Sequence, residues 1–108
     1  MDLKKIIEDT LDISVIEAFY PVIPPCATYY LATDENGISG DGQEEEGIEN
    51  YQIDIWDRSS DFVRKGSKKM KTELAAHGAT IPNISYSYDN NGKIWRATLT
   101  FSCIREEQ

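Results

Sequence analysis

The acidic residues of this chain are its most numerous candidates for chemistry, and many of them gather in one segment. Asp34-x-Asn36 with Glu45 at the twelfth position is similar to a calcium-binding loop, but position six is Ser39 where such a loop needs glycine. The segment therefore favours an acidic surface loop over a metal site, with an opportunistic divalent cation as the alternative. Seven of the 19 acidic residues belong to it: Asp34, Glu35, Asp41, Glu44, Glu45, Glu46 and Glu49.

The residue types of other catalytic and binding sites are scarce. Gly37-x-x-Gly-x-Gly42 has the glycines of a phosphate-binding run but lacks the Lys-Ser/Thr pair and the helix start that bind phosphate. His77 is the only histidine, and its place near the end of a predicted helix favours interaction with the helix dipole over general-base chemistry. With no Cys-x-x-Cys motif and no histidine near a nucleophile, the sequence predicts a non-enzymatic protein without cofactor or metal.

Size and composition predict a single domain over residues 1–108. The chain has 108 residues, of which 40% are apolar, which is enough for one core. Its net charge of −8 opposes specific or general binding to nucleic acid and to anionic membranes. Because the sequence shows no signal peptide and no long apolar run, we expect a cytoplasmic chain, with Cys26 and Cys103 as reduced thiols.

Two helices and several strands follow from the spacing of apolar residues. Asp2 can cap a short helix that ends near Asp12, and its apolar residues follow helical spacing. Ser59 or Ser60 can cap a second helix that ends before Gly78. Residues 28–32 and 51–56 are typical of strands, residues 13–20 are ambiguous between strand and linker, and residues 33–49 are expected to form a flexible acidic loop. The expected apolar positions of the two helices are Leu3, Ile6, Ile7 and Leu11, then Val63, Gly66 or Ser67, Met70 and Leu74.

The last third of the chain predicts a β-hairpin. A two-residue type I′ turn at Asn91-Gly92 would place Tyr88 opposite Trp95, Tyr86 opposite Ala97 and Ile84 opposite Leu99. This register puts both apolar sets on one face, whereas a three-residue loop would separate them. The order helix, strand, loop, strand, helix, hairpin predicts an α+β fold with an antiparallel sheet and two helices.

The charges are divided between two segments. The acids concentrate in 34–49, and six of the 11 basic residues lie in 58–71. Two solvated faces are one interpretation; the other is a head-to-tail contact in which the basic helix of one subunit meets the acidic loop of the next. Trp56 alternates away from Ile53 and Ile55, which indicates either packing on a covered face or an interface. The candidate interface residues are Asp41, Glu44, Glu45, Glu46, Trp56, Arg64, Lys65, Lys68 and Lys69.

Taken in order, these segments resemble the small tail completion and tail terminator (head–tail joining) proteins of long-tailed bacteriophages. The resemblance covers roughly residues 2–104 and rests on a pattern of elements: a proline-led aromatic strand, an acidic loop, a Tyr-x-Ile-x-Ile-Trp strand, a helix and a closing strand. The segments that carry it are Ile23-Pro-Pro-Cys-Ala-Thr-Tyr-Tyr-Leu-Ala32, Tyr51-Gln-Ile-Asp-Ile-Trp-Asp57, Ser59-Ser-Asp-Phe62 and Trp95-Arg-Ala-Thr-Leu-Thr-Phe101.

The resemblance implies an α+β virion subunit that forms a ring, commonly a hexamer, at the head–tail junction. Such a ring ends growth of the tail tube and joins it to the head connector, so the implied partners are copies of the chain itself, the major tail tube protein and the head connector protein. An acidic protein-binding or DNA-mimicking regulatory module is the alternative. Mimicry fits less well, since it scatters carboxylates over a surface, whereas here they adjoin a lysine-rich helix.

Overall fold

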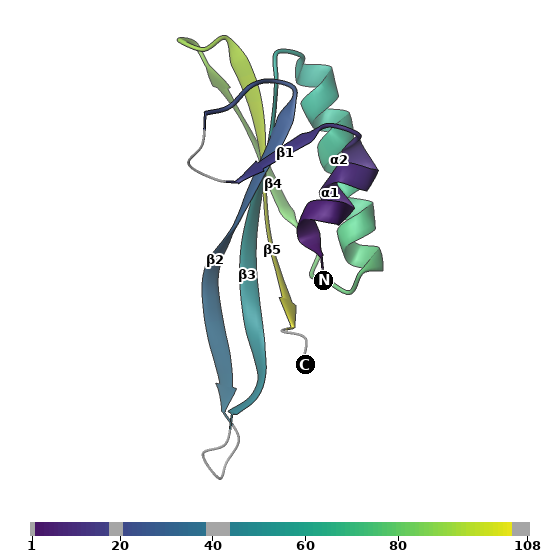
Figure 1. The fold of residues 1–108 in the computed structure, drawn as a ribbon, viewed down its shortest axis with the longest axis vertical. Coiled ribbons are helices and arrows are strands. Elements are labelled where there is room, and N and C mark those ends of the chain that lie inside the picture. The colour runs from purple at the N-terminus through teal and green to yellow at the C-terminus, as the bar shows by residue number, and fades with distance from the viewer. Residues whose placement is uncertain (1, 18–20, 39–43, 105–108) are drawn as a thin grey trace.

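The structure is a computed structural model that describes residues 2–17, 21–38 and 44–104, with the backbone alone described at 17, 34–38 and 44–46. It has the expected α+β class, with two helices and a five-stranded sheet. Figure 1 shows both helices on the same side of the sheet, so the fold has two layers. Its elements are α1 (Leu3–Leu11), β1 (Ser14–Glu17), β2 (Cys26–Ile38), β3 (Glu44–Asp57), α2 (Ser60–Ala76), β4 (Asn83–Asp89) and β5 (Ile94–Ile104).

The first helix forms where its capping residue and apolar spacing predict it. The carboxylate of Asp2 accepts a hydrogen bond of 3.2 Å from the backbone N–H of Lys5, which satisfies one of the free donors at the helix start. Its last residue is Leu11, and Asp12 follows with a φ of 52°, a left-handed conformation that stops the helix. Ile6 and Ile7 face inward, so α1 covers the sheet with one apolar face.

The sheet is mixed and not purely antiparallel, which corrects the expectation. Its strand order is β1-β2-β3-β5-β4. The ambiguous segment 13–20 contains the short strand β1, which pairs with β2 in parallel from Ser14 opposite Cys26 to Glu17 opposite Tyr29. All other pairs are antiparallel. β2 begins at Cys26, directly after the proline-rich stretch.

Strands occupy most of the segment that the sequence predicts as a loop. β2 continues to Ile38 and β3 begins at Glu44, so a loop over all of 33–49 is wrong. The remaining residues, 39–43, lie outside the described part of the chain. Thr33 pairs with Asn50 and Glu35 with Ile48, with irregular steps between Leu31 and Thr33 and after Glu35. The pairing of β2 with β3 thus builds a long hairpin, which Figure 1 shows running beyond the ends of both helices.

The second helix agrees closely with its prediction. The hydroxyl of Ser59 accepts a hydrogen bond of 3.2 Å from the N–H of Phe62, and Gly78 follows the C-cap residue His77 with a left-handed φ of 88°. The predicted apolar stripe is the buried one: Val63, Gly66, Ser67, Met70 and Leu74.

The C-terminal hairpin has the predicted register but a different turn. Tyr88 lies opposite Trp95, and Ile84 lies opposite Leu99. The final pair is Asp89 with Ile94, so the loop spans 90–93, and its left-handed residue is Lys93, with a φ of 50°. The type I′ turn at Asn91-Gly92 is therefore wrong. The register survives because a loop with an even number of residues keeps both apolar sets on one face.

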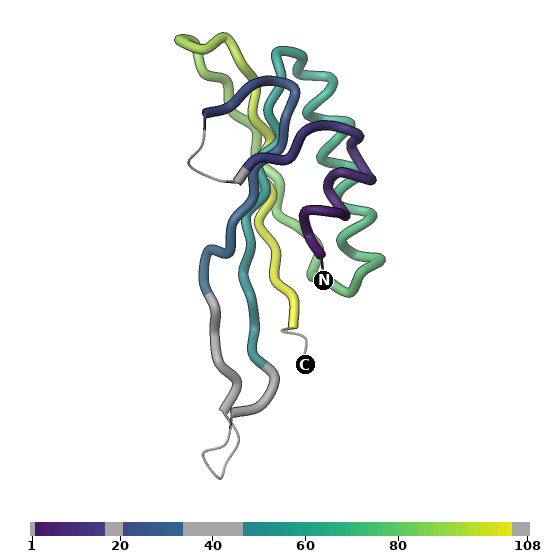
Figure 2. Tube along the Cα trace, viewed as in Figure 1, coloured from purple at the N-terminus to yellow at the C-terminus, as the bar shows by residue number. Residues whose placement is uncertain are grey.

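The core lies between the helices and one face of the sheet. Ile53 and Ile55 of β3 and Leu99 of β5 are fully buried against it. The trace in Figure 2 shows α1 beside α2, and the two helices contact each other as well as the sheet. The opposite sheet face has no helix over it, and it carries the side chains that alternate with the core residues. The clustered core residues are Leu3, Ile6, Ile7, Ala27, Ile53, Ile55, Val63, Met70, Leu74, Ala97, Leu99 and Phe101.

Candidate interaction surfaces

The basic residues of α2 lie on two different flanks of the helix. Because residues four apart share one side of a helix, Arg64 and Lys68 form one pair and Lys65 and Lys69 form another. All four side chains are exposed. The basic helix expected from the sequence thus presents its charges on two flanks.

The flank with Arg64 faces β4. The guanidinium carbon of Arg64 lies 6.0 Å from the centre of the Tyr86 ring, and the Tyr86 hydroxyl is 2.9 Å from the Ser67 hydroxyl. A cation above an aromatic face is attracted by the ring's electrons. Tyr86 is nevertheless 42% exposed, so this flank joins a fixed positive charge to accessible aromatic surface.

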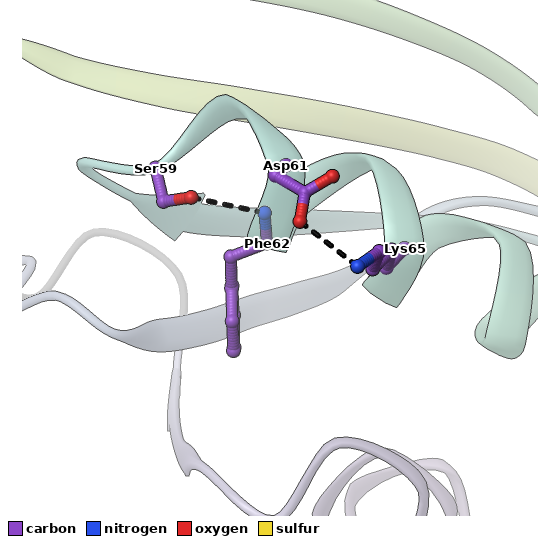
Figure 3. Close-up of polar contacts among 4 residues, drawn as sticks. All are labelled: Ser59, Asp61, Phe62 and Lys65. Carbon is purple, nitrogen blue, oxygen red and sulfur yellow. Dashed lines mark hydrogen bonds and ion pairs between the residues drawn. The ribbon is translucent and has the colours of Figure 1, made fainter.

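The flank with Lys65 faces α1. Lys65 forms an ion pair of 3.0 Å with Asp61, which precedes it by one helical turn, as Figure 3 shows beside the Ser59 cap. Lys65 and Lys69 also border a surface hollow of about 370 Å³, with Leu11 of α1 on its other side. Charges of both signs thus occur together on this flank, and its field is weaker than that of the Arg64 flank.

The acidic candidates lie on the long hairpin. Glu44, Glu45 and Glu46 form the start of β3, where their backbone pairs with β2, while Asp41 lies outside the described residues. In Figure 1 this end of the hairpin points away from α2. The structure therefore does not bring the acidic and basic candidates together within one chain, and a contact between them requires a second copy.

Trp56 lies on the sheet face that no helix covers. Its indole N–H donates a hydrogen bond of 3.1 Å to the Thr28 hydroxyl, and the Arg96 guanidinium carbon lies 5.3 Å from its ring centre. Arg96 in turn donates a hydrogen bond of 3.2 Å to the Ser87 hydroxyl. Trp56 is half-buried, so its side chain is held by its own chain and still offers apolar surface.

A polar network crosses the same face. Its only indication in the sequence is the alternation of Gln52, Asp54 and Trp56. Asp54 is only 6% exposed. It accepts hydrogen bonds of 2.6 Å from the Thr98 hydroxyl and 3.1 Å from the Gln52 amide. Tyr30 donates a hydrogen bond of 2.8 Å to the amide oxygen of Gln52. These bonds fix side chains on β2, β3 and β5 relative to one another.

The two cysteines lie far apart and are not joined in a disulfide. Cys26 pairs in register with Trp56, which pairs with Arg96, and Cys103 lies seven residues further along β5, about 23 Å away. Burial raises the pKa of the Cys26 thiol, and a backbone hydrogen bond at Ile23 partly opposes that rise.

Two further observations concern metal sites and membrane-spanning helices. In the described part of the chain, no group of three or more His, Cys, Asp and Glu side chains is arranged to hold a metal ion. Neither described helix has the length and apolar character needed to cross a bilayer. His77 is the exposed C-cap residue of α2, close to the helix end where the sequence placed it.

The chain is similar to a chain of the virion of a native gene transfer agent (GTA) particle, with 11% identity and a TM-score of 0.47, over 91% of this chain and 82% of that one. No protein-family profile matches the chain, and no curated protein does.

Proposed function

We propose that this chain is a non-enzymatic virion structural protein that forms a ring at the head-proximal end of a phage tail tube. The ring ends tail growth and joins the tail to the head connector. The order of elements supports this proposal. The acidic hairpin of β2 and β3 is followed by α2 and then by β5, which is the order that the sequence resemblance to tail completion and tail terminator proteins requires.

The observation that carries the proposal is the separation of two oppositely charged surfaces on one subunit. The acidic end of the β2–β3 hairpin lies away from the basic side of α2, so the two cannot neutralise each other within a chain (Figure 1). A contact between unlike surfaces of identical subunits is heterologous, and it closes into a ring when the rotation between neighbours allows it. We assign Asp41, Glu44, Glu45 and Glu46 to one side of this contact. The other side is one of the two basic flanks of α2, either Arg64 with Lys68 or Lys65 with Lys69.

Charge alone does not hold such a ring together. Exposed ion pairs contribute about 0–1 kcal/mol each, so apolar groups must supply most of the association energy. Trp56 with the Arg96 side chain above it offers such a surface. We therefore propose that the helix-free sheet face takes part in contacts within the ring or with the tail tube protein, and that the isolated chain assembles chiefly on the tube end.

Electron microscopy of the protein mixed with its cognate tail tubes tests the proposal. We expect added density at one end of each tube, with the rotational symmetry of a closed ring. If the tube is hexameric, the ring should be hexameric as well. A head connector protein should then bind the capped end and leave the open end free. Density distributed along the tubes, or none at either end, would contradict the ring role. If no density is seen at either end, binding of the protein to an unrelated basic partner would favour the alternative function, an acidic protein-binding module.

A further inference from the structure

The outer edge of β4 is an unpaired strand edge without the usual protection. Within the described residues β4 hydrogen-bonds only to β5, and it runs for 7 residues from Asn83 to Asp89. Edge strands are commonly shielded by lysine, proline or a bulge, because a free ladder of N–H and C=O groups can pair with another chain. β4 contains no lysine or proline, and its pairing with β5 runs without a register shift.

The surface above this edge is positively charged and aromatic. Arg64, Lys68 and Lys71 follow one another along the flank of α2 that faces β4, and the ion pair formed by α2 within the described residues lies on the other flank. Tyr86, which lies beside Arg64, and Tyr88 of the same strand are 42% and 43% exposed. A segment that paired with the edge of β4 would therefore contact basic side chains and the apolar surface of aromatic side chains.

The chain itself contains a strand of matching character. β1 pairs with β2 only as far as Tyr29, so the outer edge of residues 31–38 has no strand against it in the described part of the chain. This stretch belongs to the acidic hairpin, with Asp34 and Glu35 in β2 and Glu44, Glu45 and Glu46 in β3. Two register shifts interrupt the pairing of this stretch with β3, between Leu31 and Thr33 and between Glu35 and Gly37, so the regular part of its edge is 33–35.

Strand directions allow the two edges to meet. The strand order and the three antiparallel pairings between β2 and β4 make these two strands antiparallel within one chain. A neighbour that continues the sheet would present its β2 antiparallel to β4. This is the arrangement of the other hairpins of the fold, and strand addition of this kind takes most of its affinity from main-chain hydrogen bonds.

We propose that β4 of one subunit pairs with residues 31–38 of β2 in a second copy, so that the sheet continues across the interface and the acidic hairpin lies against Arg64, Lys68 and Lys71. This inference rests on the proposed ring, and it selects one flank of α2 and one strand edge as the contact.

Disulfide trapping between two variants tests the strand pairing. One protein carries Ser85→Cys or Ser87→Cys on β4 and the other carries Thr33→Cys on β2, both with Cys103→Ser so that the remaining native thiol is the buried Cys26. Within one chain β2 and β4 are three strand spacings apart, about 14 Å, so a crosslink in the mixture joins two chains. We expect oxidation of the mixture in the presence of tail tubes to give crosslinked dimer with at least one of the two β4 positions. Lys69→Cys with Thr33→Cys is the control, and equal yields from control and test pairs would overturn the inference.

Two matched double charge reversals test which flank of α2 takes part in the contact. Arg64→Glu with Lys68→Glu and Lys65→Glu with Lys69→Glu each reverse two exposed charges, four residues apart, on the same helix. We expect the first pair to lower the crosslinking yield about tenfold and the second to change it by about twofold or less. Equal losses would remove the preference for this flank. If the protein caps tail tubes in microscopy but the cysteine variants, bound to those tubes, give no β4–β2 crosslink, this interface is wrong and the ring role stands.

Discussion

The hydroxyl of Thr98 donates a hydrogen bond of 2.6 Å to the carboxylate of Asp54, which is only 6% exposed although no helix covers its face of the sheet. The second carboxylate oxygen accepts from Gln52 at 3.1 Å. Each oxygen of this carboxylate thus has a donor. A buried acceptor that loses its donor retains the cost of leaving water, so this contact matters more than its exposed surroundings suggest.

Replacing Thr98 with valine keeps the shape of the side chain and removes its hydroxyl. We expect Thr98→Val to lower the free energy of unfolding by about 1.5–3 kcal/mol, because Asp54 Oδ1 then lies buried without that donor. Thr100→Val, an exposed position on the same strand and face, is the control and should change stability by less than about 0.5 kcal/mol. Urea denaturation measures both values, and similar effects of the two variants would count against the role given to Asp54.

The two contacts in Figure 3 should differ in energy although they are adjacent. We expect Ser59→Ala to destabilise the protein by about 0.5–2 kcal/mol, because the N–H of Phe62 loses its capping partner. Lys65→Ala should cost less than about 0.5 kcal/mol, since the Lys65–Asp61 pair is 72% and 71% exposed and is screened by water. Thermal unfolding followed by circular dichroism distinguishes them, and a larger loss for Lys65→Ala would reverse this ranking.

Gly66 lies where α2 packs closely against α1 and β3. A Cβ atom at this position would lie 3.3 Å from Leu11 and 3.7 Å from Ile55. We expect Gly66→Val to reduce stability by about 1–3 kcal/mol through overpacking, which moves α2 away from α1. Shortening the obstructing side chain with Leu11→Ala in the same protein should then cost less than Leu11→Ala costs alone. A double-mutant cycle from urea denaturation measures this coupling, and purely additive losses would contradict it.

The buried thiol of Cys26 should make stability depend on pH in the alkaline range. Burial raises its pKa above the ordinary value of 9.0, so the unfolded chain ionises first as pH rises. The stability that Cys26 contributes is therefore present below pH 9 and is lost as pH rises toward the folded-state pKa. We expect the stability difference between wild type and Cys26→Ala to shrink above pH 9.

Thiol labelling gives an independent check on the same residue. Denatured protein without reductant should show both thiols, and in the folded protein the half-buried Cys103 should react before Cys26. Rapid labelling of Cys26 in the folded protein would contradict its burial.

The sequence predicted those parts of the fold in which local pattern and tertiary structure agree. The register of Tyr88 with Trp95 followed from alternation and an even loop, and α2 followed from the Ser59 cap and its apolar stripe. The extent of the β2–β3 hairpin did not. Glycines and like charges in 33–49 indicate a loop. In the structure, the backbone of many of these residues forms paired strands instead, between β2 and β3. The four residues of β1 are too few to show alternation, so its parallel pairing could not be predicted.

The candidate surfaces were predictable by charge and not by position. Sequence spacing identifies the basic residues of α2, but only the packing of that helix shows that Arg64 lies over Tyr86 while Lys69 borders the hollow beside Leu11. Asp54 was indistinguishable from any other acid, because its burial arises from residues on three separate strands. The free edge of β4 depends on strand order, which the sequence alone left open.

The position of β5 between β3 and β4 has a consequence for how the protein is made. The N-terminal part of the chain leaves the ribosome first, so β1, β2, β3 and α2 emerge while one edge of β3 still lacks its partner, β5. That edge is filled, and Ile53 and Ile55 gain their neighbours Leu99 and Ala97, only after residue 104 has left the exit tunnel. Nascent chains on one polysome therefore carry exposed edges close together. Folding as soon as β5 has emerged, or a chaperone that shields β3 until then, would decide the yield of assembly-competent subunits.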